Sequence, residues 1–109
     1  MSDAAGPSAR VSCRLDSTQL GTQLARYQRL GRHAESVVRS SGQLLVSFSR
    51  GLPTDLLAHT LDVERRCCPF VHATYDVHQA QLPISVDTVD QDPRLDSLFD
   101  ALTRGLQPH

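Results

Sequence analysis

The chain has 109 residues, a formal net charge of -1 and a hydrophobic content of 39%, which suits one compact domain and leaves little room for a second. Acidic and basic residues are balanced, twelve against eleven, and aromatic residues make up 5% with no tryptophan, so we expect neither a nucleic-acid nor a membrane partner. All the basic residues are arginines, which excludes Schiff-base chemistry on a lysine.

The first ten residues (MSDAAGPSAR) are small and polar and lack the apolar core of a signal peptide. We therefore expect a disordered tail over 1–10 and a single domain over 11–106. The longest apolar run, residues 44–46, is far shorter than the roughly 18 to 20 residues that cross a bilayer. Three cysteines are an odd number and two of them are adjacent, which argues against a secreted disulfide framework and favours a reducing cytoplasm.

The first half of the chain predicts a helix followed by a strand. The helix is capped by Asp16 or Ser17 and loses its pattern between Gly31 and Val38. Its apolar stripe consists of Leu20, Leu24, Tyr27 and Leu30, and its opposite, polar face carries Gln19, Gln23, Arg26 and Arg29. After a turn signal at residues 40–42, residues 43–49 (QLLVSFS) have the length and the β-branched and aromatic content of a strand. The buried face of that strand is predicted to carry Leu44, Val46 and Phe48.

A second helix is predicted to open at Pro53, because proline is tolerated in the first helical turn. Its stripe consists of Leu57, Leu61, Glu64 and Cys68. Pro69 disfavours helical dihedral angles at the preceding residue. We therefore expect the helix to stop or distort at the Cys67 and Cys68 pair.

The last third of the chain predicts a hairpin and a helix. Residues 70–78 (FVHATYDVH) and 82–87 (LPISVD) alternate between apolar and polar, and the short turn between them favours an antiparallel hairpin. Pro83 has no N–H, which favours an edge position for the second strand. A final helix is expected to start at Asp92 and Pro93.

The predicted order is α-β-α-β-β-α, an α+β fold with a small three-stranded sheet and helices packed on it. Three strands leave an edge open to pairing with another chain. We therefore expect a homodimer.

The cysteines are the residues of this chain best suited to bind a ligand or to catalyse a reaction. A bond between Cys67 and Cys68 would close a strained ring, so we do not expect it as a resting state. Their thiolates could instead converge on a thiophilic cation such as Zn(II) or Cu(I). With Cys13 in support, three thiolates would suit Zn(II), Hg(II) or As(III), and His72 or His59 could complete a zinc site. The alternative is that the cysteines simply pack as small apolar side chains.

Glu64 continues the apolar stripe toward Cys68. We expect that end of the stripe to bend into solvent; the alternative is a buried carboxylate that pairs with an arginine or moves a proton beside the thiols. His59 is expected to face solvent or a partner, with a general-base role as the alternative. His78 is expected at the surface.

A pattern of short motifs runs along the chain: Cys13-x-Leu15, a strand led by Gly42, Glu64-x-x-Cys67-Cys68-x-Phe70 and a terminal helix around Leu98-Phe99. It resembles a group of small uncharacterised actinobacterial proteins and modules appended to regulators of the MerR type. The resemblance spans about residues 11–106 and implies a sensing or thiol function for Cys13, Glu64, Cys67 and Cys68. We find no helix-turn-helix here, which argues against a direct transcriptional role.

Three functions follow as hypotheses. We favour a cytosolic thiol-dependent module that binds or senses a soft metal or metalloid through Cys67 and Cys68, with Cys13 in support. The second is a small cysteine-dependent enzyme or redox protein in which Glu64 or a histidine assists. The third is a structural dimerisation domain without a site. Motifs of hydrolases, kinases and nucleotide-binding proteins are absent from the sequence, which disfavours those classes.

Overall fold

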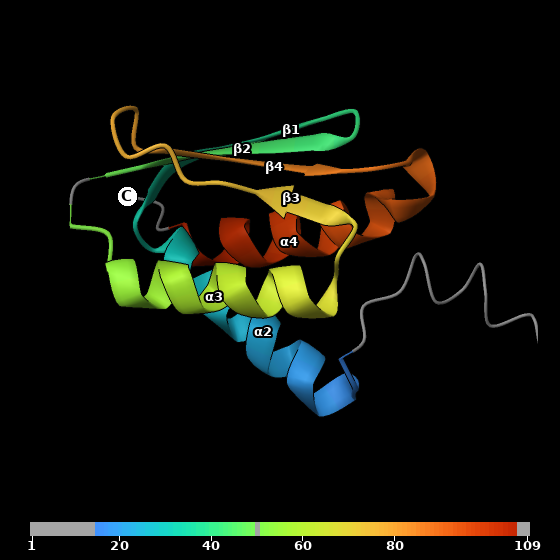
Figure 1. The fold of residues 1–109 in the computed structure, drawn as a ribbon. Coiled ribbons are helices and arrows are strands. Elements are labelled where there is room, and N and C mark those ends of the chain that lie inside the picture. Colours follow the sequence, from blue (N-terminus) through green and yellow to red (C-terminus); the bar gives the residue numbers. More distant parts are fainter. Residues whose placement is uncertain (1–14, 50, 107–109) are drawn as a thin grey trace, which may run out of the picture.

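The computed structural model describes residues 15–49 and 51–106. In these ranges three α-helices lie against one face of a four-stranded antiparallel sheet (Figure 1). The helices are α2 (Ser17–Gly31), α3 (Thr54–Cys67) and α4 (Asp92–Gly105), and a 3-10 turn, η1 (Val89–Gln91), precedes α4. The strands are β1 (Ala34–Ser40), β2 (Gln43–Phe48), β3 (Val71–Ala73) and β4 (Gln81–Val86). The predicted α+β class is confirmed, while the expected tail over 1–10 lies outside the described residues.

The sheet has one strand more than the sequence predicted. β1 forms a tight hairpin with β2 in which Ser40 pairs with Gln43, and Gly42 supplies the positive φ of +71° that the turn requires. The prediction missed β1 because its sequence, AESVVRS, shows no clear alternation and its register shifts between Ala34 and Ser36. An edge strand that is only half-buried leaves a weak hydrophobic pattern.

The strand order is β1-β2-β4-β3, so β4 is internal and the expected edge position of Pro83 is wrong. Gln81 exchanges backbone hydrogen bonds with Asp76, and Pro83, two residues further on, presents its backbone to the same side of β4. β3 ends at Ala73, short of the position opposite Pro83. The missing N–H of Pro83 therefore faces an interrupted part of the ladder rather than a continuous partner strand.

The same interruption explains why residues 70–78 do not form one strand. β3 covers only Val71–Ala73, and Val77, which the alternation placed on the buried side, is 71% exposed. The chain turns after Asp76 and passes through Ala80 with a φ of +54°. The antiparallel pairing of β3 with β4 is nevertheless the hairpin that the sequence predicted.

The core lies between the sheet and the helices. The predicted buried face of β2, with Leu44, Val46 and Phe48, is confirmed. β4 adds Leu82 and Ile84 to it. The helices cover this surface with Tyr27, Leu30, Leu57, Leu61, Leu95, Leu98 and Leu102.

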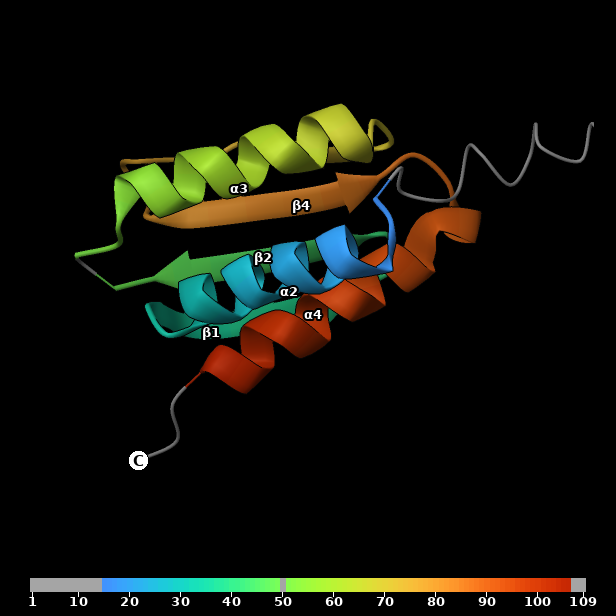
Figure 2. The same cartoon turned by 90° about the horizontal axis from the view of Figure 1, so that it is seen from below.

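Helix α2 runs beside both α3 and α4 in the helical layer (Figure 2). It begins as predicted, since Asp16 caps it and forms a reciprocal capping box with Gln19. α2 and α4 approach closely because Gly31 and Gly105 lie at their contact, where a Cβ atom would overlap the backbone of the facing helix. No helix in the described ranges combines the length and apolar character needed to cross a membrane.

Candidate functional site

The cysteine pair lies where α3 ends. Cys67 is the last helical residue, and Cys68 follows it with φ -130° and ψ 74°, outside helical geometry. The N–H of Cys68 still donates to the Glu64 carbonyl oxygen at 2.7 Å. The predicted stop at the pair is confirmed, and its cause is the restriction that Pro69 places on the preceding residue.

The two cysteines differ in their chemical state. Cys68 is fully buried and disulfide-bonded, whereas Cys67 is half-buried and free. The argument against disulfides is therefore wrong for Cys68, although the adjacent pair itself is not bonded, as expected. A disulfide sulfur is not a thiolate, so Cys68 cannot bind a metal ion until its bond is reduced. Cys13, the remaining cysteine of the sequence, lies outside the described residues.

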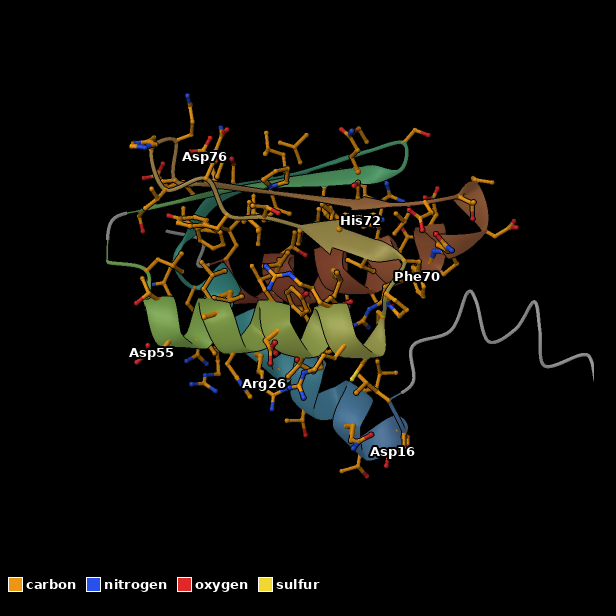
Figure 3. The ribbon with its side chains drawn as sticks, in the orientation of Figure 1. Asp16, Arg26, Asp55, Phe70, His72 and Asp76 are labelled. Atoms are coloured by element: carbon orange, nitrogen blue, oxygen red, sulfur yellow. The ribbon has the colours of Figure 1, made fainter. Side chains whose placement is uncertain are left out.

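The histidines do not join the pair. His72 is exposed on β3 (Figure 3). Its Nε2 lies 2.6 Å from Oδ1 of Asp87. His59 and His78 are exposed, as the sequence predicted for both. Among residues 15–49 and 51–106, no three side chains of the types that hold metal ions are grouped together. The described part of the fold therefore does not bring His72 to a site shared with the cysteines.

Cys67 lines a pocket of about 290 Å³ between the start of α2 and the end of α3. In Figures 1 and 2 these two helix ends lie at the same end of the molecule. The described lining consists of Leu15, Thr18, Gln19, Thr22, Arg26, Val63, Arg66 and Cys67. None of these residues is acidic and two are arginines, so the pocket presents a thiol beside positive charge.

The two arginines are held differently. Arg26 is half-buried and donates from Nη1 to Oε1 of Gln23 at 2.8 Å. Arg66 is exposed and pairs with Asp62, one turn earlier on α3, at 2.9 Å. A guanidinium has five N–H donors in a planar fork, so each arginine keeps donors beyond the bond described.

Glu64 lies in the core, not at the thiols. It is 1% exposed, and the guanidinium of Arg94 donates to both of its carboxylate oxygens at 2.9 Å. Tyr27 and Gln23 also donate to Oε1, each at 3.0 Å. The expectation that Glu64 bends into solvent is wrong, and the alternative of a buried partner for an arginine holds. With four donated hydrogen bonds, this carboxylate is a structural anion that joins α2, α3 and α4.

Sequence reasoning missed the other members of this buried cluster. Gln23 was assigned to the polar face of the first helix, yet it is fully buried and also donates to the Thr60 carbonyl oxygen at 2.9 Å. Arg94 carried no sequence signal beyond its place in the first turn of α4. The one available clue was Glu64 itself, since a carboxylate on an apolar stripe requires a buried donor.

Tyr27 makes this cluster sensitive to alkaline pH. Burial, and then the neighbouring Glu64 carboxylate, raise the pKa of the Tyr27 phenol well above its ordinary value. The folded protein thus keeps a proton that the unfolded chain releases above about pH 10, so the stabilisation is complete below that pH and is lost as pH rises. In denaturant unfolding between pH 9 and 12, we expect an added loss approaching about 1.4 kcal/mol per pH unit, absent in Tyr27→Phe. Tyr75→Phe is the control; equal slopes in the two variants would contradict the assignment.

No protein-family model, curated protein or solved structure matches the chain. The resemblance to small actinobacterial proteins and MerR-linked modules therefore stays a prediction. It rests on the short pattern that contains Cys13, Glu64, Cys67 and Cys68.

Proposed function

We propose that this protein is a cytoplasmic, thiol-dependent module that senses or binds a soft metal ion or metalloid, and that the disulfide at Cys68 is its oxidised, closed state. The observation that carries the proposal is that two adjacent cysteines at the end of α3 differ in state: Cys68 is disulfide-bonded and Cys67 is free. One end of one helix therefore holds both a reducible bond and an available thiol. The second sulfur of that bond lies outside the described residues, and Cys13, the supporting cysteine of the hypothesis, is the candidate that peptide mapping tests.

A disulfide is good support for a dithiol site. Two sulfurs that form a bond of about 2.05 Å must be brought together by the fold. After reduction, two cysteines held that close can both reach one soft cation, for which a sulfur ligand lies at about 2.3 Å in the case of Zn(II). Reduction by two external thiols gives two cysteine thiols and one external disulfide, and uptake of a divalent cation then releases the two protons.

Binding of Zn(II) and Hg(II) tests the proposal. The protein is fully reduced and then freed of reductant under anaerobic conditions. We expect this reduced protein to bind one ion per chain, as measured by native mass spectrometry. The same spectra report whether the expected homodimer forms. Protein oxidised at Cys68 is expected to bind much more weakly. Cys68→Ser should lower the affinity of the reduced protein by more than about a hundredfold, since even the loss of outer partners of a metal site costs about 10- to 100-fold.

The control variant is His72→Ala. His72 pairs with Asp87 at the surface of the sheet, so its loss should leave the affinity of the reduced protein within about twofold of the wild type. Equal metal binding by reduced and oxidised protein, or by Cys68→Ser and wild type, would overturn the proposed function. Peptide mapping of unreduced protein identifies the partner of Cys68, and a partner other than Cys13 would also count against it.

A second candidate, a redox protein that works by thiol–disulfide exchange, is favoured by the free thiol of Cys67 in its own pocket. It predicts that Cys67→Ser abolishes disulfide reductase turnover in an assay with an external thiol. Metal uptake without turnover would leave the sensing function alone.

A further inference from the structure

Cys67 lines a pocket, and Cys68 is not among the described residues of its lining. Its described lining combines one free thiol, two arginines, hydroxyl and amide groups and the apolar side chains Leu15 and Val63. The volume of about 290 Å³ lies at the lower end of the range for small-molecule sites. A small molecule therefore suits it better than a folded partner.

Within residues 15–49 and 51–106, Cys67 has no available disulfide partner. Its neighbour Cys68 is already bonded, and a bond between adjacent residues would close a strained ring. A disulfide that Cys67 forms in the pocket therefore takes its second sulfur from outside the described residues, and a small thiol molecule from solution can supply it. That molecule enters beside Arg26 and Arg66, and no carboxylate among the described lining residues opposes an anion there.

Two hydrogen bonds in sequence connect the Arg26 guanidinium to the buried Glu64 carboxylate. Its Nη1 donates to Oε1 of Gln23, while the amide nitrogen of Gln23 donates to the buried Glu64 carboxylate. Figure 3 shows Arg26 in the helical layer, well apart from His72 on the sheet. The half-buried guanidinium is thus oriented through the core, which reduces the entropy lost when it binds a ligand. Arg66 is already paired with Asp62, so its contribution is the smaller one.

We propose that the Cys67 pocket binds a small thiol that carries a carboxylate, and holds it as a mixed disulfide with Cys67. The Cys67 thiolate attacks one sulfur of the symmetrical disulfide of that thiol, the S–S bond breaks, and the second thiolate leaves, so no further oxidant is needed. The carboxylate accepts hydrogen bonds from the guanidinium of Arg26, with Arg66 beside it. This inference rests on the proposed thiol function only in that Cys67 is reactive.

The test uses three disulfides that differ in charge: 3,3′-dithiodipropionate, bis(2-hydroxyethyl) disulfide and cystamine. They are added to full-length protein purified without reductant, and mass spectrometry with peptide mapping follows the mixed disulfide at Cys67. Each rate is divided by the rate with the peptide Glu-Arg-Arg-Cys-Ser-Pro-Phe, which keeps the local charges of residues 64–70 and loses the pocket. The anionic reagent is expected to exceed the cationic one by about tenfold after this correction.

Arg26→Gln should remove most of that preference and Arg66→Gln a smaller part. The matched control is Arg104→Gln, because Arg104 forms an exposed pair with Asp100 at the same spacing as Arg66 with Asp62. Thermal unfolding checks that each variant is folded. A corrected preference below twofold, a preference unchanged in Arg26→Gln, or a Cys67-linked dimer as the main product would overturn the pocket proposal.

These outcomes are separable from those of the proposed function. If reduced protein binds Zn(II) and Hg(II) but the charge preference fails, only the pocket proposal falls. If the preference holds and metal uptake fails, the pocket remains and the metal function falls. An unreactive Cys67, with no mixed disulfide from any of the three reagents, contradicts the pocket proposal whatever the metal result.

Discussion

Replacing Arg94 with methionine is expected to destabilise the fold by about 3–5 kcal/mol, because it leaves the Glu64 carboxylate buried without its counter-charge. Both side chains are nearly inaccessible, with 6% and 1% of their surfaces exposed, and they meet through two hydrogen bonds of 2.9 Å. Equilibrium unfolding in urea at pH 7 measures the loss. A loss this large is a major share of the stability of a domain of this size, so part of the variant should be unfolded at 37 °C.

Arg104→Met provides the matched control. Arg104 pairs with Asp100 over one helical turn of the same helix, but both side chains are exposed, so its loss should cost no more than about 1 kcal/mol. The double variant Glu64→Gln/Arg94→Met removes both charges and keeps an acceptor for Tyr27, so it should recover part of the loss. If Arg94→Met and Arg104→Met are equally stable, the buried ion pair does not hold the helices together.

Gly31→Ala and Gly105→Ala are each expected to cost about 2–4 kcal/mol by overpacking the contact between α2 and α4. A Cβ atom at Gly31 would overlap the carbonyl oxygen of Leu102, and one at Gly105 would overlap that of Gln28. Both obstacles are backbone atoms, so no side-chain rotation can relieve them. The helices must separate, which opens the core that they cover. Thermal and urea unfolding of both variants measure this cost.

Gly21→Ala is the opposite case on the same helix. A Cβ atom at Gly21 meets no atom within 4 Å, and alanine favours the helix by about 0.8–1 kcal/mol over glycine. The variant should therefore be more stable than the wild type. Equal effects at Gly21 and Gly31 would show that the substitutions act through helix propensity alone and not through the close approach of the helices.

Features that depend only on residues close together in the sequence could be predicted. The start of α2 at Asp16, the start of α4 at Asp92 and the end of α3 at the cysteine pair all depend on capping side chains or on proline. The same holds for the alternating buried faces of β2 and β4. These features need no knowledge of distant residues, because they follow from local dihedral preferences and from periodic burial.

The errors concern positions whose surroundings come from elsewhere in the chain. β1 was missed because an edge strand buries little and its pattern is weak. Pro83 was placed at an edge because only the fold reveals that β3 ends before reaching it. Gln23 was placed in solvent because its partners, the Thr60 carbonyl and Glu64, lie about 40 residues away.

By itself the sequence determined the α+β class, the starts of the helices and the end of α3 at the cysteine pair. The tertiary structure decided what each residue there does. It placed Cys68 in a disulfide, left Cys67 free beside Arg26, and buried Glu64 against Arg94. The physical reason is that a side chain's charge state, partners and access to solvent depend on long-range packing, whereas caps, turns and periodic burial are properties of neighbouring residues.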